Sequence, residues 1–68
     1  MDHRWLDIAE AIRTVGVREY RDALIVFANA KYPGVVQVPS EQSFRAWMKE
    51  SNAPEHIVRL CEEMAKGG

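Results

Sequence analysis

Four short stretches of this chain repeat their apolar residues at helical spacing, and this periodicity constrains the fold more than any other feature. The stretches cover residues 3–14, 18–31 and 40–51 and the region after residue 52. A strand-like pattern occurs only in YPGVVQVP, residues 32–39, so any strand pairing there would need a second copy of the chain. The sequence therefore predicts an all-α fold, a small bundle of about four short helices with an extended loop near residues 33–39.

Residues with marked backbone preferences indicate where the helices begin and end. Asp2 is expected to cap the first helix, and Gly16 to adopt a left-handed conformation after it. Ser40 follows a proline and is expected to cap the third helix. In NAPE, Asn52 is the expected cap of the last helix, with Glu55 completing a capping box three residues later.

The size of the chain indicates one small helical domain, residues 1–68, with modest stability. Its 47% of hydrophobic residues is enough for a core and an exposed apolar patch, so a homodimer is expected. Cys61 has no second cysteine to pair with and lies on an apolar helical stripe. We therefore expect a buried thiol in a reducing, cytoplasmic compartment.

The sequence contains no recognisable catalytic or metal-binding motif. His3 and His56 lie far apart along the chain, and glycine-rich phosphate loops and paired cysteines are missing. No apolar run approaches the length of about 20 residues that a membrane span requires. We predict a protein that is not an enzyme, with no cofactor, no metal, no small-molecule substrate and no membrane partner.

The third helical stretch carries the residues best suited to DNA recognition. If Phe44, Trp47 and Met48 face the core, the opposite side presents Gln42, Ser43, Arg45 and Lys49. Glutamine pairs with adenine and arginine with guanine in the major groove, while serine and lysine suit phosphates. The alternative is a merely solvated face, because Glu41 and Glu50 dilute its positive charge and the whole chain has a formal charge of -1.

The segment SEQSFRAWMKESNAPEHIVRLCEEMA resembles the second half of the phage repressor and Cro type of helix-turn-helix domain. The matching residues are a small capping residue, a polar pair, inward-facing aromatics and a short loop, here Ser40, Gln42, Ser43, Phe44, Trp47, Asn52 and Pro54. The resemblance implies a helix-turn-helix-like arrangement and a small, dimeric transcriptional regulator of phage or mobile-element type that binds double-stranded DNA. Groove contacts would fall on Gln42, Ser43 and Arg45, and phosphate contacts on Lys49 and Asn52.

A second hypothesis is a small protein–protein interaction module, such as a phage-encoded inhibitor that binds a host protein. The negative formal charge and the long connection FANAKYPGVVQVPS between the second and third helices favour it. Its candidate partner-binding residues are Trp5, Tyr32 and Val36, because exposed aromatics anchor many protein interfaces. Trp5 is the aromatic most expected to be exposed, since it lies near the terminus.

Overall fold

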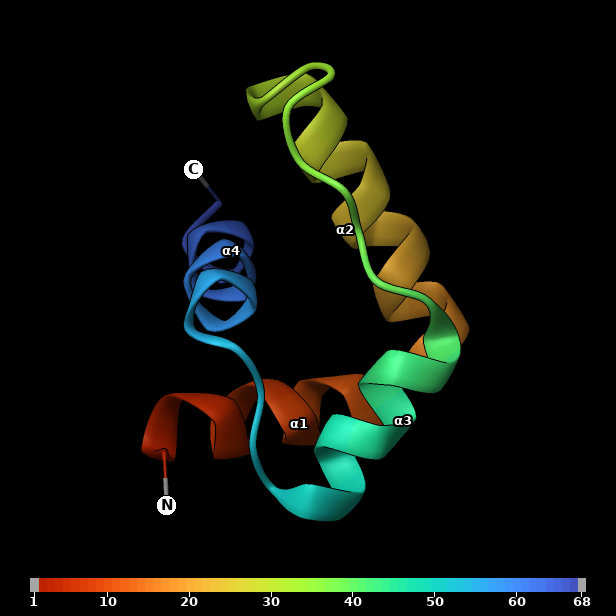
Figure 1. Cartoon of the computed structure of the whole chain (residues 1–68), viewed down its shortest axis with the longest axis vertical. Helices are drawn as coiled ribbons and strands as arrows, with labels where there is room; N and C mark the ends of the chain where they lie inside the picture. The colour runs from red at the N-terminus through yellow and green to blue at the C-terminus, as the bar shows by residue number, and fades with distance from the viewer. Residues whose placement is uncertain (1, 68) are drawn as a thin grey trace.

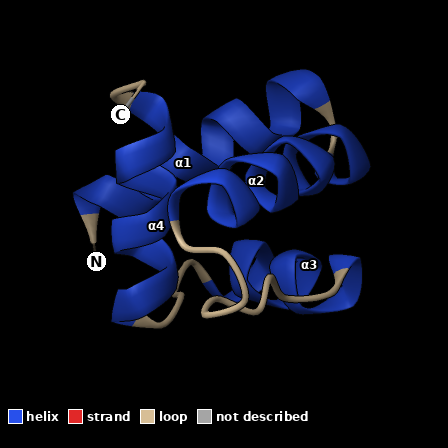
Figure 2. Ribbon diagram, turned by 90° about the horizontal axis from the view of Figure 1, so that it is seen from above, coloured by secondary structure: helices blue, strands red, loops and turns tan. Residues whose placement is uncertain are grey.

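A computed structural model describes residues 2–67 and confirms the all-α prediction, because these residues form four helices and no strand. The helices are α1 (His3–Val15), α2 (Val17–Lys31), α3 (Glu41–Glu50) and α4 (Glu55–Ala65). Figure 1 shows α4 lying across α1, with α2 rising from the far end of α1. All four helices contribute to one core, and Figure 2 shows α3 on the side of α2 where the long connection also runs.

The connection formed by residues 32–40 returns along α2 instead of turning directly into α3 (Figure 1). Arg21, in the first half of α2, donates from Nε to the carbonyl oxygen of Pro39 at 2.7 Å. Arg18 reaches Glu41 in the first turn of α3, with Nε and Oε1 3.2 Å apart. Consequently α3 begins beside the start of α2, and the extended loop predicted near residues 33–39 spans most of that helix.

Two of the predicted helix caps are present. The Asp2 carboxylate accepts from the backbone N–H of Arg4 at 3.0 Å, and the Ser40 hydroxyl oxygen accepts from that of Ser43 at 3.3 Å. Gly16 has the expected positive φ of 98°, but its ψ of 144° lies outside the left-handed helical region. Because only glycine adopts such a conformation without steric cost, Gly16 lets α2 begin immediately after α1 in a new direction.

The predicted capping box of the last helix is wrong. α4 begins at Glu55 with Pro54 at its N-cap position, and no side chain caps it. A proline disfavours helical backbone in the residue before it, so the helix cannot begin as early as a cap at Asn52 would require. The Glu55 carboxylate instead pairs with Arg4 and Arg59.

Aromatic side chains join α1, α2 and α3 at one end of the core. The ring of Phe44 packs edge-on against Trp47 and Tyr20, with centroid distances of 5.6 and 6.4 Å. Trp5 packs edge-on against Trp47 at 6.5 Å. The remaining buried residues are aliphatic or small, and they include Cys61, as predicted: Ile8, Ala9, Ile12, Leu24, Ala28, Ile57, Val58, Leu60 and Cys61.

Candidate functional site

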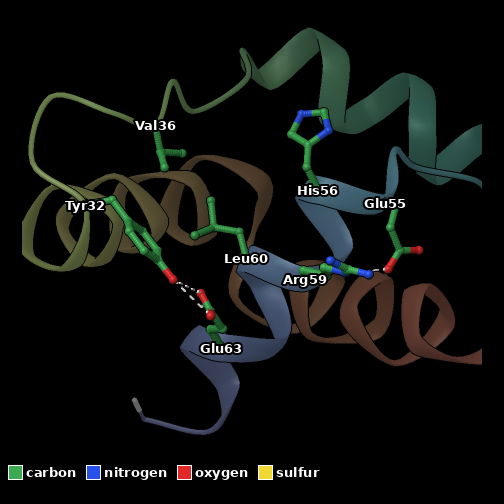
Figure 3. Close-up of a pocket in the computed structure, with 7 residues that line it drawn as sticks. All are labelled: Tyr32, Val36, Glu55, His56, Arg59, Leu60 and Glu63. Atoms are coloured by element: carbon green, nitrogen blue, oxygen red, sulfur yellow. Dashed lines mark hydrogen bonds and ion pairs between the residues drawn. The ribbon is translucent and has the colours of Figure 1, made fainter.

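A groove of about 520 Å³ lies between the long connection and α4, and we call it the Tyr32 groove. Its lining residues come from two parts of the chain far apart in sequence (Figure 3): Tyr32, Val36, Glu55, His56, Arg59, Leu60 and Glu63. Figure 3 shows the side chain of Val36 directed toward Leu60, while His56 stands at the edge nearest α3. The aliphatic residues form an apolar floor, and charged groups surround it.

A hydrogen bond from Tyr32 links the connection to α4 at one end of the groove. The Tyr32 hydroxyl group lies 3.0 and 2.9 Å from the two carboxylate oxygens of Glu63, to which it donates. This hydrogen bond raises the pKa of Tyr32, because the carboxylate stabilises the protonated phenol. Lys31 places Nζ 3.7 Å from Glu63 Oε1 and 5.8 Å from the centre of the Tyr32 ring. Both the loop and the helix are therefore held where they flank the groove.

An ion-pair cluster occupies the other end of the groove. Arg4 donates to both carboxylate oxygens of Glu55 at 2.9 and 2.7 Å, and Arg59 donates to Glu55 Oε2 at 3.0 Å. Hydrogen bonds first from Arg4 and then from Arg59 lower the pKa of Glu55 to about 2. Arg4 also pairs with Asp2 and Glu62, at 2.9 and 3.7 Å. The carboxylate at this end of the groove therefore stays ionised near neutral pH.

Of the three predicted partner-binding residues, two line this groove and one is buried. Tyr32 and Val36 are half-buried, and both line the groove. Trp5 has no exposed surface, so the expectation that it is an exposed anchor is wrong. Its indole N–H donates to the carbonyl oxygen of Trp47 at 3.2 Å, and the two rings pack edge-on where the first turn of α1 meets the end of α3.

The candidate DNA-binding residues form a second surface on α3. Gln42, Arg45 and Lys49 are exposed and share one helical face. Ser43 is half-buried, and its hydroxyl oxygen lies 3.2 Å from that of Ser40. Asn52 is exposed but lies beyond the end of α3, in the connection to α4.

Acidic side chains balance the cations on this α3 surface. Glu41 lies 3.4 Å from Arg45 and 3.2 Å from Arg18, and these contacts, chiefly the hydrogen bond from Arg18, lower the pKa of Glu41. Glu50 is exposed at the other end of the helix. The face has the residue types suited to DNA, but as many carboxylates as cations on the helix itself.

The sequence did not indicate that Leu60, Glu63, His56 and Arg59 would join Tyr32 in one groove. Glu63 in particular reads as part of a solvated acidic pair with Glu62, whereas its contact with Tyr32 spans 31 residues of sequence. The one available signal was the exposed polar flank of α4, next to an apolar stripe. Such a flank does not reveal which distant segment lies against it.

Three further features of the described residues bear on their chemistry: the buried thiol of Cys61, the acidic and histidine side chains, and a second hollow. Burial raises the pKa of the Cys61 thiol, which disfavours the thiolate form that acts as a nucleophile. Residues 2–67 contain no cluster of three or more His, Cys, Asp or Glu side chains that could hold a metal ion. A further hollow of about 500 Å³ lies between α1 and α4, but it contains none of the predicted site residues. Among the same residues, no helix is both long enough and apolar enough to cross a bilayer.

Comparisons of this chain with protein-family models, curated proteins and solved structures returned no match.

Proposed function

We propose that the protein is a small interaction module that binds a segment of a partner protein in the Tyr32 groove. The observation that carries this proposal is the convergence of Tyr32 and Val36 with Leu60 around one groove of about 520 Å³. An apolar floor with a few oriented polar groups at its rim is the usual composition of a binding site. A phage-encoded inhibitor of a host protein is one example of this class.

The surrounding contacts support a groove that exists before a partner arrives. The Tyr32–Glu63 hydrogen bonds hold one end of the connection, and Arg21 holds the other through Pro39. A site whose walls are already ordered loses less conformational entropy when it binds. We assign this function to the cytoplasm, because Cys61 is a free, buried thiol of the kind found in reducing compartments.

The first experiment is a selection of linear peptides from a displayed random library against the folded protein, followed by calorimetric measurement of Kd. Val36→Lys places a charge in the groove and is expected to weaken binding at least about tenfold. Val35→Lys is the matched control, because Val35 is adjacent to Val36 in the sequence, but its side chain is 79% exposed and does not line the groove. Equal binding by both variants, with unchanged circular dichroism, would refute the groove as the binding site.

We retain DNA binding through α3 as a second candidate, because Gln42, Arg45 and Lys49 lie together on an exposed face. In this proposal the protein is a dimeric regulator of helix-turn-helix type, with Ser43 and Asn52 contributing contacts at the edge of the face. It ranks second because Glu41 engages Arg45 and Arg18, and because α3 is reached through residues 32–40 rather than a short turn.

Fluorescence anisotropy of labelled random duplexes at two salt concentrations tests the DNA proposal. Sequence-preferring binding that weakens steeply with salt, and that Arg45→Ala abolishes, is the expected result if the proposal holds. Arg13→Ala is the matched control, because Arg13 is an exposed arginine on α1. Absence of binding at low salt would leave the α3 face as a solvated surface.

We also propose that the module forms a homodimer through the outer face of α2. Val26 is 70% exposed there, and Ala23 and Ala30, one turn away on either side, are exposed as well. Sedimentation velocity would show a dimer that Val26→Glu dissociates, whereas a monomer at all concentrations would refute the proposal.

A further inference from the structure

We infer that the Tyr32 groove binds its partner by strand addition: an extended peptide segment pairs with the backbone of Val36–Val38 and places one aliphatic side chain in the groove. This inference rests on the proposed interaction function and specifies the partner's conformation and chemistry. Three observations support it, namely the state of the backbone, the alternation of side chains and the position of the groove.

The backbone of Val36, Gln37 and Val38 is unpaired. None of the hydrogen bonds within residues 2–67 uses an N–H or carbonyl group of these three residues. The pairing resumes on both sides, where Val35 donates to the carbonyl oxygen of Tyr32 and Pro39 accepts from Arg21. Backbone amides are strong hydrogen-bonding groups, so three consecutive unpaired residues provide a ready edge for another strand.

The side chains of this segment alternate as they do in a strand. Val35 and Gln37 are exposed, whereas Val36 and Val38 are half-buried and pack against the core. A period of two and β-branched residues both favour pairing with an extended chain. Pro33 and Pro39 lack the N–H group and confine the edge to the few residues between them.

The groove lies where the added strand would place its inward side chain. Opposed side chains on paired strands have Cβ atoms about 4.5–5.5 Å apart, so a residue opposite Val36 would project into the same space. Figure 3 shows that this space is bounded by Val36, Tyr32 and Leu60. An aliphatic side chain therefore fits the floor, while the backbone pairing fixes its register.

The charge around the groove indicates what flanks the aliphatic residue. Among the residues that line the groove, two carboxylates, those of Glu55 and Glu63, face one cation, that of Arg59. The formal charge of these lining residues is therefore negative, with His56 counted as neutral. The complementary segment therefore carries a lysine or arginine beside its aliphatic anchor.

Hydrogen exchange measured by NMR, with the tightest-binding peptide of the library selection as the probe, tests the pairing directly. In the full chain saturated with this peptide, at least one amide of Val36, Gln37 or Val38 is expected to exchange about tenfold more slowly than in the free protein. The N–H group of exposed Val35 serves as the internal control, because it is already bonded to Tyr32. Unchanged exchange at all three positions in the saturated complex would overturn the inference.

A scan of the same peptide with single backbone N-methyl groups provides a second readout. Methylation at alternate positions is expected to weaken binding about tenfold or more, and the intervening positions should tolerate it. Losses that follow a helical spacing, or no spacing, would overturn strand addition while leaving the interaction function intact. Failure to select any peptide that distinguishes Val36→Lys from Val35→Lys would instead refute the interaction function on which the inference rests.

The alternative occupant of the Tyr32 groove is the segment Val36–Val38 of a second copy of this chain. Protection of the Val36–Val38 amides in a dimer before peptide is added, with peptide dissociating that dimer, would overturn the assignment to a foreign peptide. A monomer whose three amides are unprotected until peptide is added would support it.

Discussion

The Tyr32 groove and the outer face of α3 differ in how many parts of the chain build them. The groove combines residues 32–36 with α4 and is held by contacts such as Tyr32–Glu63. The α3 face comes from one helix, and its residues line neither the Tyr32 groove nor the hollow between α1 and α4. The comparison teaches that residue types within one helix can define a candidate surface. A groove whose two sides are held in place requires tertiary contacts between segments distant in sequence.

The largest expected effect on stability comes from removing the buried side chain that supports α3. Trp5→Ala deletes a fully buried ring that packs against Trp47 and donates to its carbonyl oxygen. We expect a loss of about 3–5 kcal/mol in the free energy of unfolding, measured by urea denaturation. His3→Ala, at an exposed position of the same helix, is the control, and equal effects of the two substitutions would contradict the role given to Trp5.

The start of α3 depends on its cap. Ser40→Ala removes the oxygen that accepts from the Ser43 N–H, and we expect it to cost about 1 kcal/mol of stability. Ser43→Ala leaves that acceptor in place and should cost less. If the two variants have the same urea midpoint, the cap does not stabilise α3.

On the groove side, Tyr32→Phe removes only the hydroxyl group that donates to Glu63. We expect a modest fall in Tm, smaller than that of Ser40→Ala, together with weaker peptide binding because one wall of the groove is released. A double-mutant cycle with Glu63→Ala, which removes the accepting oxygens, isolates this contact. Additive effects in the cycle would show that the two side chains do not stabilise each other.

Lowering the pH tests the contribution of the Glu55 ion pairs at the rim of the groove. The folded-state pKa of Glu55 is about 2 and its ordinary value is 4.5, so its ion pairs stabilise the fold above pH 4.5. This contribution is lost progressively as the pH falls from 4.5 toward 2. The difference in urea midpoint between the wild type and Arg4→Gln should therefore shrink between pH 7 and pH 2. Arg13→Gln is the control, and a constant Arg4→Gln difference would contradict the assignment.

The smallest effect is expected on the α3 face. Arg45→Ala removes an exposed pair with Glu41 in adjacent helical turns, and it should leave both the urea midpoint and peptide binding unchanged. A clear loss of stability would mean that the Glu41 contact holds α3 in place.

The helices could be predicted from the sequence because apolar spacing and capping residues are local signals. Asp2 and Ser40 act as predicted, since a cap needs only the next few residues. Asn52 fails because Pro54 changes the backbone preference just before the helix, and this local rule outweighs the capping pattern.

The groove could be predicted only in part. Tyr32 and Val36 stand out because they lie in the segment that breaks the helical pattern, but their partners on α4 depend on how the connection returns along α2. The prediction that Trp5 is exposed is wrong for the same reason, since nearness to the terminus gives no information about its contact with Trp47. Contacts across dozens of residues carry no periodic signal.

The pairing of Trp5 with Trp47 also determines what intrinsic fluorescence can report. These are the only two tryptophans in the chain, and their ring centroids lie 6.5 Å apart where α1 meets α3. Neither lines the Tyr32 groove. Tryptophan emission is thus a built-in optical probe of the α1–α3 junction, and a peptide that occupies the groove without disturbing that junction will leave the spectrum unchanged.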